Sequence, residues 1–122
     1  MKYLCLIYYD EHKLDALSSS EFDALVREAV DYDGRMRESG HYVTSNALQP
    51  TRTATSLRVQ GGRVSVTDGP FAETKEQLCG FIVIAAQDLD DAIRVASGIP
   101  AARLGCVELR PVRDLSRWGG TH

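Results

Sequence analysis

Cysteine is scarce in this chain of 122 residues, and the three that occur (Cys5, Cys79 and Cys106) form no CxxC pair. The count is odd and each cysteine lies inside an apolar run. This pattern predicts small buried side chains rather than disulfides. Free thiols are typical of a reducing compartment, so we expect a cytoplasmic protein.

The chain also lacks a basic block and a long hydrophobic run. The formal net charge is −3 with both signs interspersed. No segment is of the kind that coats a phosphate backbone, so we expect no nucleic-acid partner. The apolar run at residues 3–9 is too short to cross a bilayer and lacks the features of a signal peptide, so we expect no membrane association.

Several catalytic signatures are missing as well. The serines form no nucleophile elbow, and no glycine-rich phosphate loop is present. No histidine has a second histidine or cysteine at the spacing of a metal site. We therefore expect neither a metal nor another cofactor.

The length and composition of the chain are those of one globular domain. Its length and its 43% hydrophobic residues favour a single domain over residues 1–122, with a tail from about 114 to 122 that Trp118 anchors. Apolar patterning predicts strands, two helices capped by Ser20 and Asp88, and a hairpin around Gly61-Gly62. The strands are expected at 1–9, 41–48, 80–86 and 107–112, the helices at 21–38 and 89–96, and the hairpin at 55–66.

The order β-α-β, hairpin, β-α-β predicts an α+β fold of the ferredoxin-like plan with an inserted β-hairpin. Two helices cover only one face of such a sheet, yet the strands at 1–9 and 80–86 are apolar on both faces. A second copy of the chain is the simplest cover for the other face, so we expect a homodimer.

One residue interrupts the apolar stripe of the first helix. At 100° per residue, Asp33 falls about 20° from Phe22. A carboxylate in that position is costly unless it reaches solvent, pairs with an arginine or faces a wet cavity. We count Asp33 among the candidate ligand-binding residues.

The loop at residues 68–77 (DGPFAETKEQ, called the 68–77 loop below) concentrates charge between two apolar strands. Asp68, Gly69 and Pro70 suit a tight turn, and the charges that follow are compatible with a solvated face. The alternative is the rim of a pocket for a small polar ligand. The candidate ligand-binding residues in this loop are Phe71, Glu73, Lys75 and Glu76.

Acid/base chemistry is the second possibility. Asp68 is a candidate catalytic base, or a group that orients His41, because a histidine beside a carboxylate titrates near neutral pH. A histidine that begins a strand is also compatible with a plain surface hydrogen bond. We list Asp68 and His41 as candidate catalytic residues.

The 68–77 loop, followed by Gly80-Phe81, resembles the DGPF-domain branch of the YciI-like (YCII-related) family. The opening MKYL, the segment Ser39-Gly40-His41 and the final VELRPV agree with it. The resemblance implies a dimeric α+β barrel in which two ferredoxin-like protomers place their sheets face to face.

The resemblance also bears on catalysis. Some members carry a histidine on the first helix and an aspartate in an Asp-Pro after the second. Here the helix at 21–38 has no histidine, and Ile99-Pro100 follows the second helix, so that pair is absent. Three functions stay open: a small-molecule binding protein, a small acid/base enzyme, and an interaction partner of a transcription regulator such as a sigma factor.

Overall fold

The structure is a computed structural model, and residues 1–116 are described; the tail residues 117–122, with Trp118, lie outside the described part. In chain order the helices and strands are β1 (Lys2–Tyr9), α1 (Glu11–Asp15), α2 (Ser19–Glu38), β2 (Tyr42–Ala47), the 3₁₀ turn η1 (Thr51–Thr53), β3 (Thr55–Gln60), β4 (Arg63–Asp68), β5 (Gln77–Ala85), α3 (Leu89–Ala96), α4 (Ala101–Leu104) and β6 (Cys106–Pro111).

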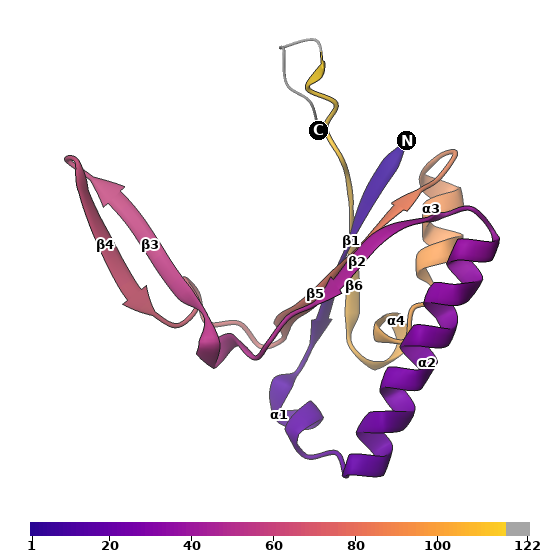
Figure 1. The fold of residues 1–122 in the computed structure, drawn as a ribbon, viewed down its shortest axis with the longest axis horizontal. Coiled ribbons are helices and arrows are strands. Elements are labelled where there is room, and N and C mark those ends of the chain that lie inside the picture. The colour runs from indigo at the N-terminus through magenta and orange to yellow at the C-terminus, as the bar shows by residue number, and fades with distance from the viewer. Residues whose placement is uncertain (117–122) are drawn as a thin grey trace.

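Four strands form the main sheet in the order β2-β5-β1-β6, and all neighbouring pairs are antiparallel. Helices α2, α3 and α4 lie together on one side of this sheet (Figure 1). The described chain is therefore an α+β fold with antiparallel sheets, as the sequence predicts.

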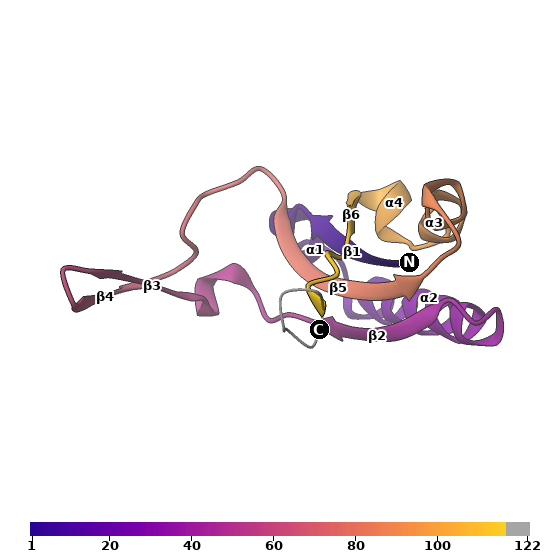
Figure 2. The same cartoon turned by 90° about the horizontal axis from the view of Figure 1, so that it is seen from above.

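The hairpin of β3 and β4 forms a separate two-stranded sheet, which we call the arm (residues 55–68). It projects away from the main sheet and the helices in both views (Figures 1 and 2). Gly61 and Gly62 form its turn, and both have positive φ (57° and 75°), which a primed hairpin turn requires. The predicted turn is confirmed.

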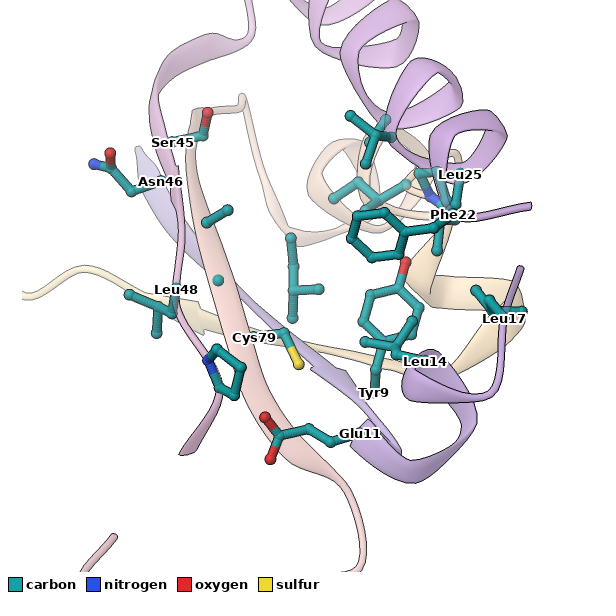
Figure 3. A pocket seen from close by; sticks show the side chains of 18 of the residues that line it. Tyr9, Glu11, Leu14, Leu17, Phe22, Leu25, Ser45, Asn46, Leu48 and Cys79 are labelled. Carbon is teal, nitrogen blue, oxygen red and sulfur yellow. The ribbon is translucent and has the colours of Figure 1, made fainter. Parts of the chain in front are cut away.

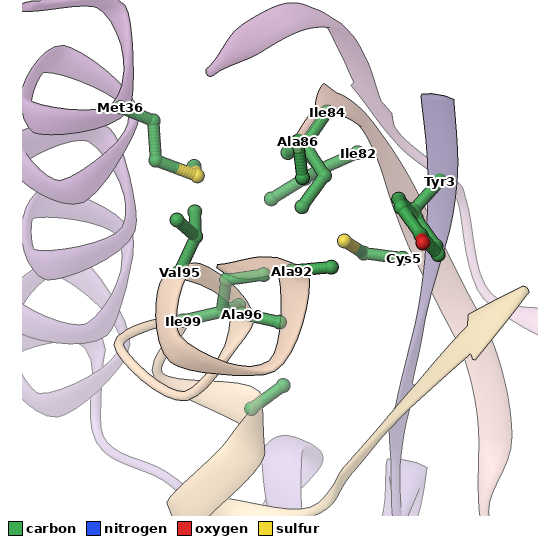
Figure 4. Close-up of a cluster of buried hydrophobic side chains, with 11 residues drawn as sticks. Tyr3, Cys5, Met36, Ile82, Ile84, Ala86, Ala92, Val95, Ala96 and Ile99 are labelled. Atoms are coloured by element: carbon green, nitrogen blue, oxygen red, sulfur yellow. The ribbon is translucent and has the colours of Figure 1, made fainter. Parts of the chain in front are cut away.

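The core lies between the main sheet and the helices (Figure 4). Alternation along β1 turns Tyr3 and Cys5 toward the helices, and Ile82 and Ile84 of β5 point the same way. Burial raises the pKa of the Cys5 thiol to about 11, so it stays protonated at neutral pH. The helices contribute Met36, Ala92, Val95, Ala96 and Ala101 to this core, and Ile99 joins them from the turn between α3 and α4.

Local signals place the helix ends. Helix α2 begins after a capping box, in which the Ser18 hydroxyl accepts from the Glu21 amide and the Glu21 carboxylate accepts from the Ser18 amide. The sequence points to Ser20 as the cap, two residues too late, because three consecutive serines offer equivalent side chains. Asp88 caps α3 as predicted. The short helices α1 and α4 are not anticipated by the sequence pattern.

The three cysteines differ in their burial. Cys5 is buried and Cys79 half-buried, but Cys106 is exposed, because β6 is the edge strand of the sheet; the prediction for Cys106 is wrong. Within residues 1–116, no helix combines the length and the apolar character that a bilayer-crossing segment needs.

The face of the main sheet opposite the helices, called the open face, carries no element of the described chain in Figures 1 and 2. The ladder places Leu4 and Leu6 of β1 beside Val83 and Phe81 of β5 on this face. At the edges stand polar side chains, Thr44 and Asn46 on β2 and Glu108 and Arg110 on β6. An apolar centre with a polar rim is the composition of a protein interface.

Candidate functional site

A cavity of about 640 Å³ lies between the main sheet, α1 and the N-terminal half of α2. This volume is within the range of small-molecule sites. Figure 3 shows apolar side chains entering it from three elements, with Leu14 on α1, Phe22 and Leu25 on α2, and Cys79 on β5. The cavity therefore has an apolar wall on nearly every side.

Helix α2 leaves this space open because it packs tightly only near its end. Met36 is 1% exposed, whereas Phe22 and Val26 on the same stripe are 45% and 44% exposed. The helix is therefore pinned to the core at its C-terminal end while its first half stands off the sheet. Large apolar side chains that face a solvent-open cavity are available to a ligand.

One end of the cavity is held by Glu11, the first residue of α1 (Figure 3). Its carboxylate accepts hydrogen bonds from the Thr51 amide (2.9 Å) and the Thr51 hydroxyl. Its own amide donates to Oε1 of Gln77 at 2.9 Å. Glu11 thus ties α1 to the turn η1 and to the start of β5.

Asp33 lines the same cavity from α2 and is half-buried. Within residues 1–116 no hydrogen bond or ion pair engages its carboxylate. Burial raises the pKa of Asp33, and the nearby charge of Arg37 only partly opposes this. Because the pKa is higher in the folded than in the unfolded chain, ionisation at neutral pH opposes folding, and this cost vanishes as the pH falls through the folded pKa. A carboxylate kept at a cost in stability marks a candidate functional residue.

The Tyr9 phenol and the Cys79 thiol of the wall are neutral at physiological pH. Burial is the largest cause of the raised pKa of the Tyr9 phenol and of the Cys79 thiol. A thiol in this state is a poor nucleophile, because the thiolate is the reactive form. The cavity therefore presents Tyr9 and Cys79 as polarisable walls rather than as attacking groups.

The 68–77 loop does not line this cavity. Asp68 ends β4 at the base of the arm, Phe71 is 84% exposed, and Glu73 and Lys75 are exposed. Glu76 is half-buried but is not part of the cavity wall. The loop reaches the cavity only indirectly, since Gln77 bonds to the carbonyl of Thr74 and to the amide of Glu11.

His41 lies at a different place, where α2 leads into β2. Its Nδ1 is 2.7 Å from the Ser39 hydroxyl, and its Nε2 is 3.2 Å from Oδ2 of Asp91 on α3. Hydrogen bonds, first from the Gln87 amide and then from Arg94 and His41, lower the pKa of Asp91. His41 therefore fastens β2 to α3, and the structure does not bring it next to Asp68.

A family model described as the YCII-related domain matches residues 1–116. The chain belongs to the YCII-related family. It is also 38% identical over 114 residues to an uncharacterized protein of Rhizobium meliloti (strain 1021), with 92% of each chain covered. Neither finding assigns an activity to the chain.

In this YCII-related protein, sequence reasoning finds one residue of the cavity wall, Asp33, and misses Tyr9, Glu11 and Cys79. The signal for Asp33 is its place in the apolar stripe of α2. Tyr9 and Cys79 carry no such signal, because each belongs to an ordinary apolar strand and acquires its neighbours only through the pairing of β1 with β5.

Proposed function

We propose that this YCII-related protein is a homodimeric small-molecule binding protein whose site is the cavity between α2 and the main sheet. The observation that carries the proposal is the separation of the first half of α2 from the main sheet. It leaves Phe22 and Val26 about half exposed above a concave wall. Among the residues predicted from the sequence, Asp33 belongs to this site.

The dimer is part of the proposal because the open face has an apolar centre. We take the strand order β2-β5-β1-β6 to be the ferredoxin-like plan, and we pair two open faces as a dimeric barrel. The arm supports this. Leu57, Val59, Val64 and Val66 share one side of it through their pairing, and they are between 61% and 64% exposed. An isolated hairpin is only marginally stable in water, so the arm also favours a partner surface.

Two other functions stay predictions: catalysis at Asp68 and His41, and an interaction with a transcription regulator. No contact within residues 1–116 joins Asp68 to His41. The imidazole is engaged on both nitrogens by Ser39 and Asp91, which favours a structural role for it.

The binding proposal is tested by filling the cavity. Ala29 of α2 lines the wall, and Ala29→Phe adds an aromatic ring where a ligand would lie. In a thermal-shift screen of metabolites, we expect compounds that raise the melting temperature of the wild type to have no effect on this variant. A site already occupied by a protein side chain offers no free apolar surface.

Ala24→Phe is the matched control. Ala24 lies on the same helix, is exposed and is not part of the cavity wall, so this variant should respond to ligands as the wild type does. The binding proposal fails if no compound raises the melting temperature of the wild type. It also fails if the same compounds raise the melting temperatures of both variants.

A further inference from the structure

The charged residues of the cavity wall all carry the same sign. Among residues 1–116, four acidic residues line it, whereas no lysine, arginine or histidine does. A chain with 14 basic and 17 acidic residues would give a mixed wall if charges were distributed evenly. The acidic residues of the wall are Glu11, Asp15, Asp23 and Asp33.

Two of these acids stand close to the apolar part of the cavity. The partners of the Glu11 carboxylate are the neutral amide and hydroxyl of Thr51, so its negative charge is not neutralised there. Asp33 is half-buried and engaged by no group within the described part of the chain. The charge of Arg37 lowers the pKa of Asp33, but its guanidinium lies over the Tyr42 ring, 4.2 Å from the ring centroid, and Arg37 is not part of the wall.

Aromatic side chains of the wall also favour a cation over an anion. The rings of Tyr9 and Phe22 enter the cavity (Figure 3). The face of an aromatic ring attracts a cation, most strongly where water is excluded. An anionic ligand would meet only carboxylates, and within the wall it would find no cationic side chain to pair with.

We propose that the cavity selects organic cations, that is, small molecules with an apolar or aromatic body and an ammonium group. This inference rests on the proposed function, since it specifies the ligand class of the same cavity. The body of the ligand packs against Leu25, Val26 and Ala29, which line the cavity within three helical turns of Asp33, and its ammonium group pairs with Asp33. Lys75, a candidate ligand-binding residue from the sequence, is exposed and lies outside the cavity wall, so this proposal does not use it.

The test is a calorimetric titration of the full chain with three probes that share one hydrocarbon body: naphthylmethylamine, naphthylmethanol and naphthoate. We expect the amine to bind up to about 5-fold more tightly than the alcohol, the effect of one partly exposed ion pair, and the carboxylate to bind most weakly. In Asp33→Asn the advantage of the amine over the alcohol should disappear while the affinity for the alcohol is unchanged.

Asp31→Asn is the matched control, because Asp31 is on the same helix, is exposed and is not part of the wall. It removes the same charge and should keep the preference for the amine. If the alcohol or the carboxylate binds as tightly as the amine, and Ala29→Phe abolishes that binding, the cavity is a site but the charge preference is overturned. If none of the three probes binds, both the inference and the proposed function are overturned. Equal loss of the preference in both aspartate variants also overturns the assignment to Asp33.

Discussion

Leu6→Asp should convert the proposed homodimer into monomers. Leu6 lies on β1 at the centre of the open face, between Phe81 and Glu108 in the ladder. In a face-to-face dimer this change buries two uncompensated carboxylates. A buried charge without a partner costs about 3–5 kcal/mol, which corresponds to a loss of dimer affinity of about 100-fold or more. Light scattering coupled to size exclusion, at several protein concentrations, measures the change.

Leu89→Asp is the control for this substitution. Leu89 is about half exposed at the first turn of α3, where a carboxylate suits the helix dipole, so the variant should remain dimeric. The variant Leu6→Asp must also keep the circular-dichroism spectrum of the wild type, which separates dissociation from unfolding. A wild type that is monomeric at every concentration would refute the dimer.

Among the substitutions proposed on α2, Met36→Ala should cause the largest loss in the free energy of unfolding. Met36 is the one residue of α2 that is fully buried, and it fastens the helix to the core formed by β5 and α3. Truncation of a buried methionine to alanine costs about 2–5 kcal/mol, because apolar contacts are lost and a cavity remains. Against the 5–15 kcal/mol that holds a typical domain together, this is a large fraction. Urea unfolding at a fixed protein concentration measures it.

Val30→Ala provides the comparison, since Val30 is on the same helix and 59% exposed. We expect this change to alter the free energy of unfolding by no more than about 0.5 kcal/mol. Equal losses for the two variants would contradict the assignment of Met36 as the anchor of α2.

Sequence patterns predicted the parts of the fold that local physics decides. Gly61-Gly62 predicts its hairpin because few residues other than glycine tolerate positive φ at two successive positions. Asp88 predicts the start of α3 because its side chain satisfies an orphan amide of the first turn. The short helix α1 was missed, since five residues are too few to show a hydrophobic period.

The candidate site was predictable only where a residue broke its own pattern. Asp33 was found because a carboxylate on an apolar stripe has to be explained. The link from His41 to Asp91 spans 50 positions of the chain, and the link from Glu11 to Gln77 spans 66, so neither follows from local spacing. The charge density of the 68–77 loop favours a pocket rim. The distance of the loop from the cavity wall, however, is decided by where the arm leaves the sheet.

The central claim is that the ligand site is the cavity under α2 and not the 68–77 loop. Two-dimensional amide NMR of the full chain, titrated with naphthylmethylamine, tests this directly. We predict that the shifted amide signals belong to the wall, foremost Leu25, Ala29, Ala47 and Cys79, while those of Phe71, Glu73 and Lys75 stay in place. Shifts confined to the 68–77 loop would contradict the account.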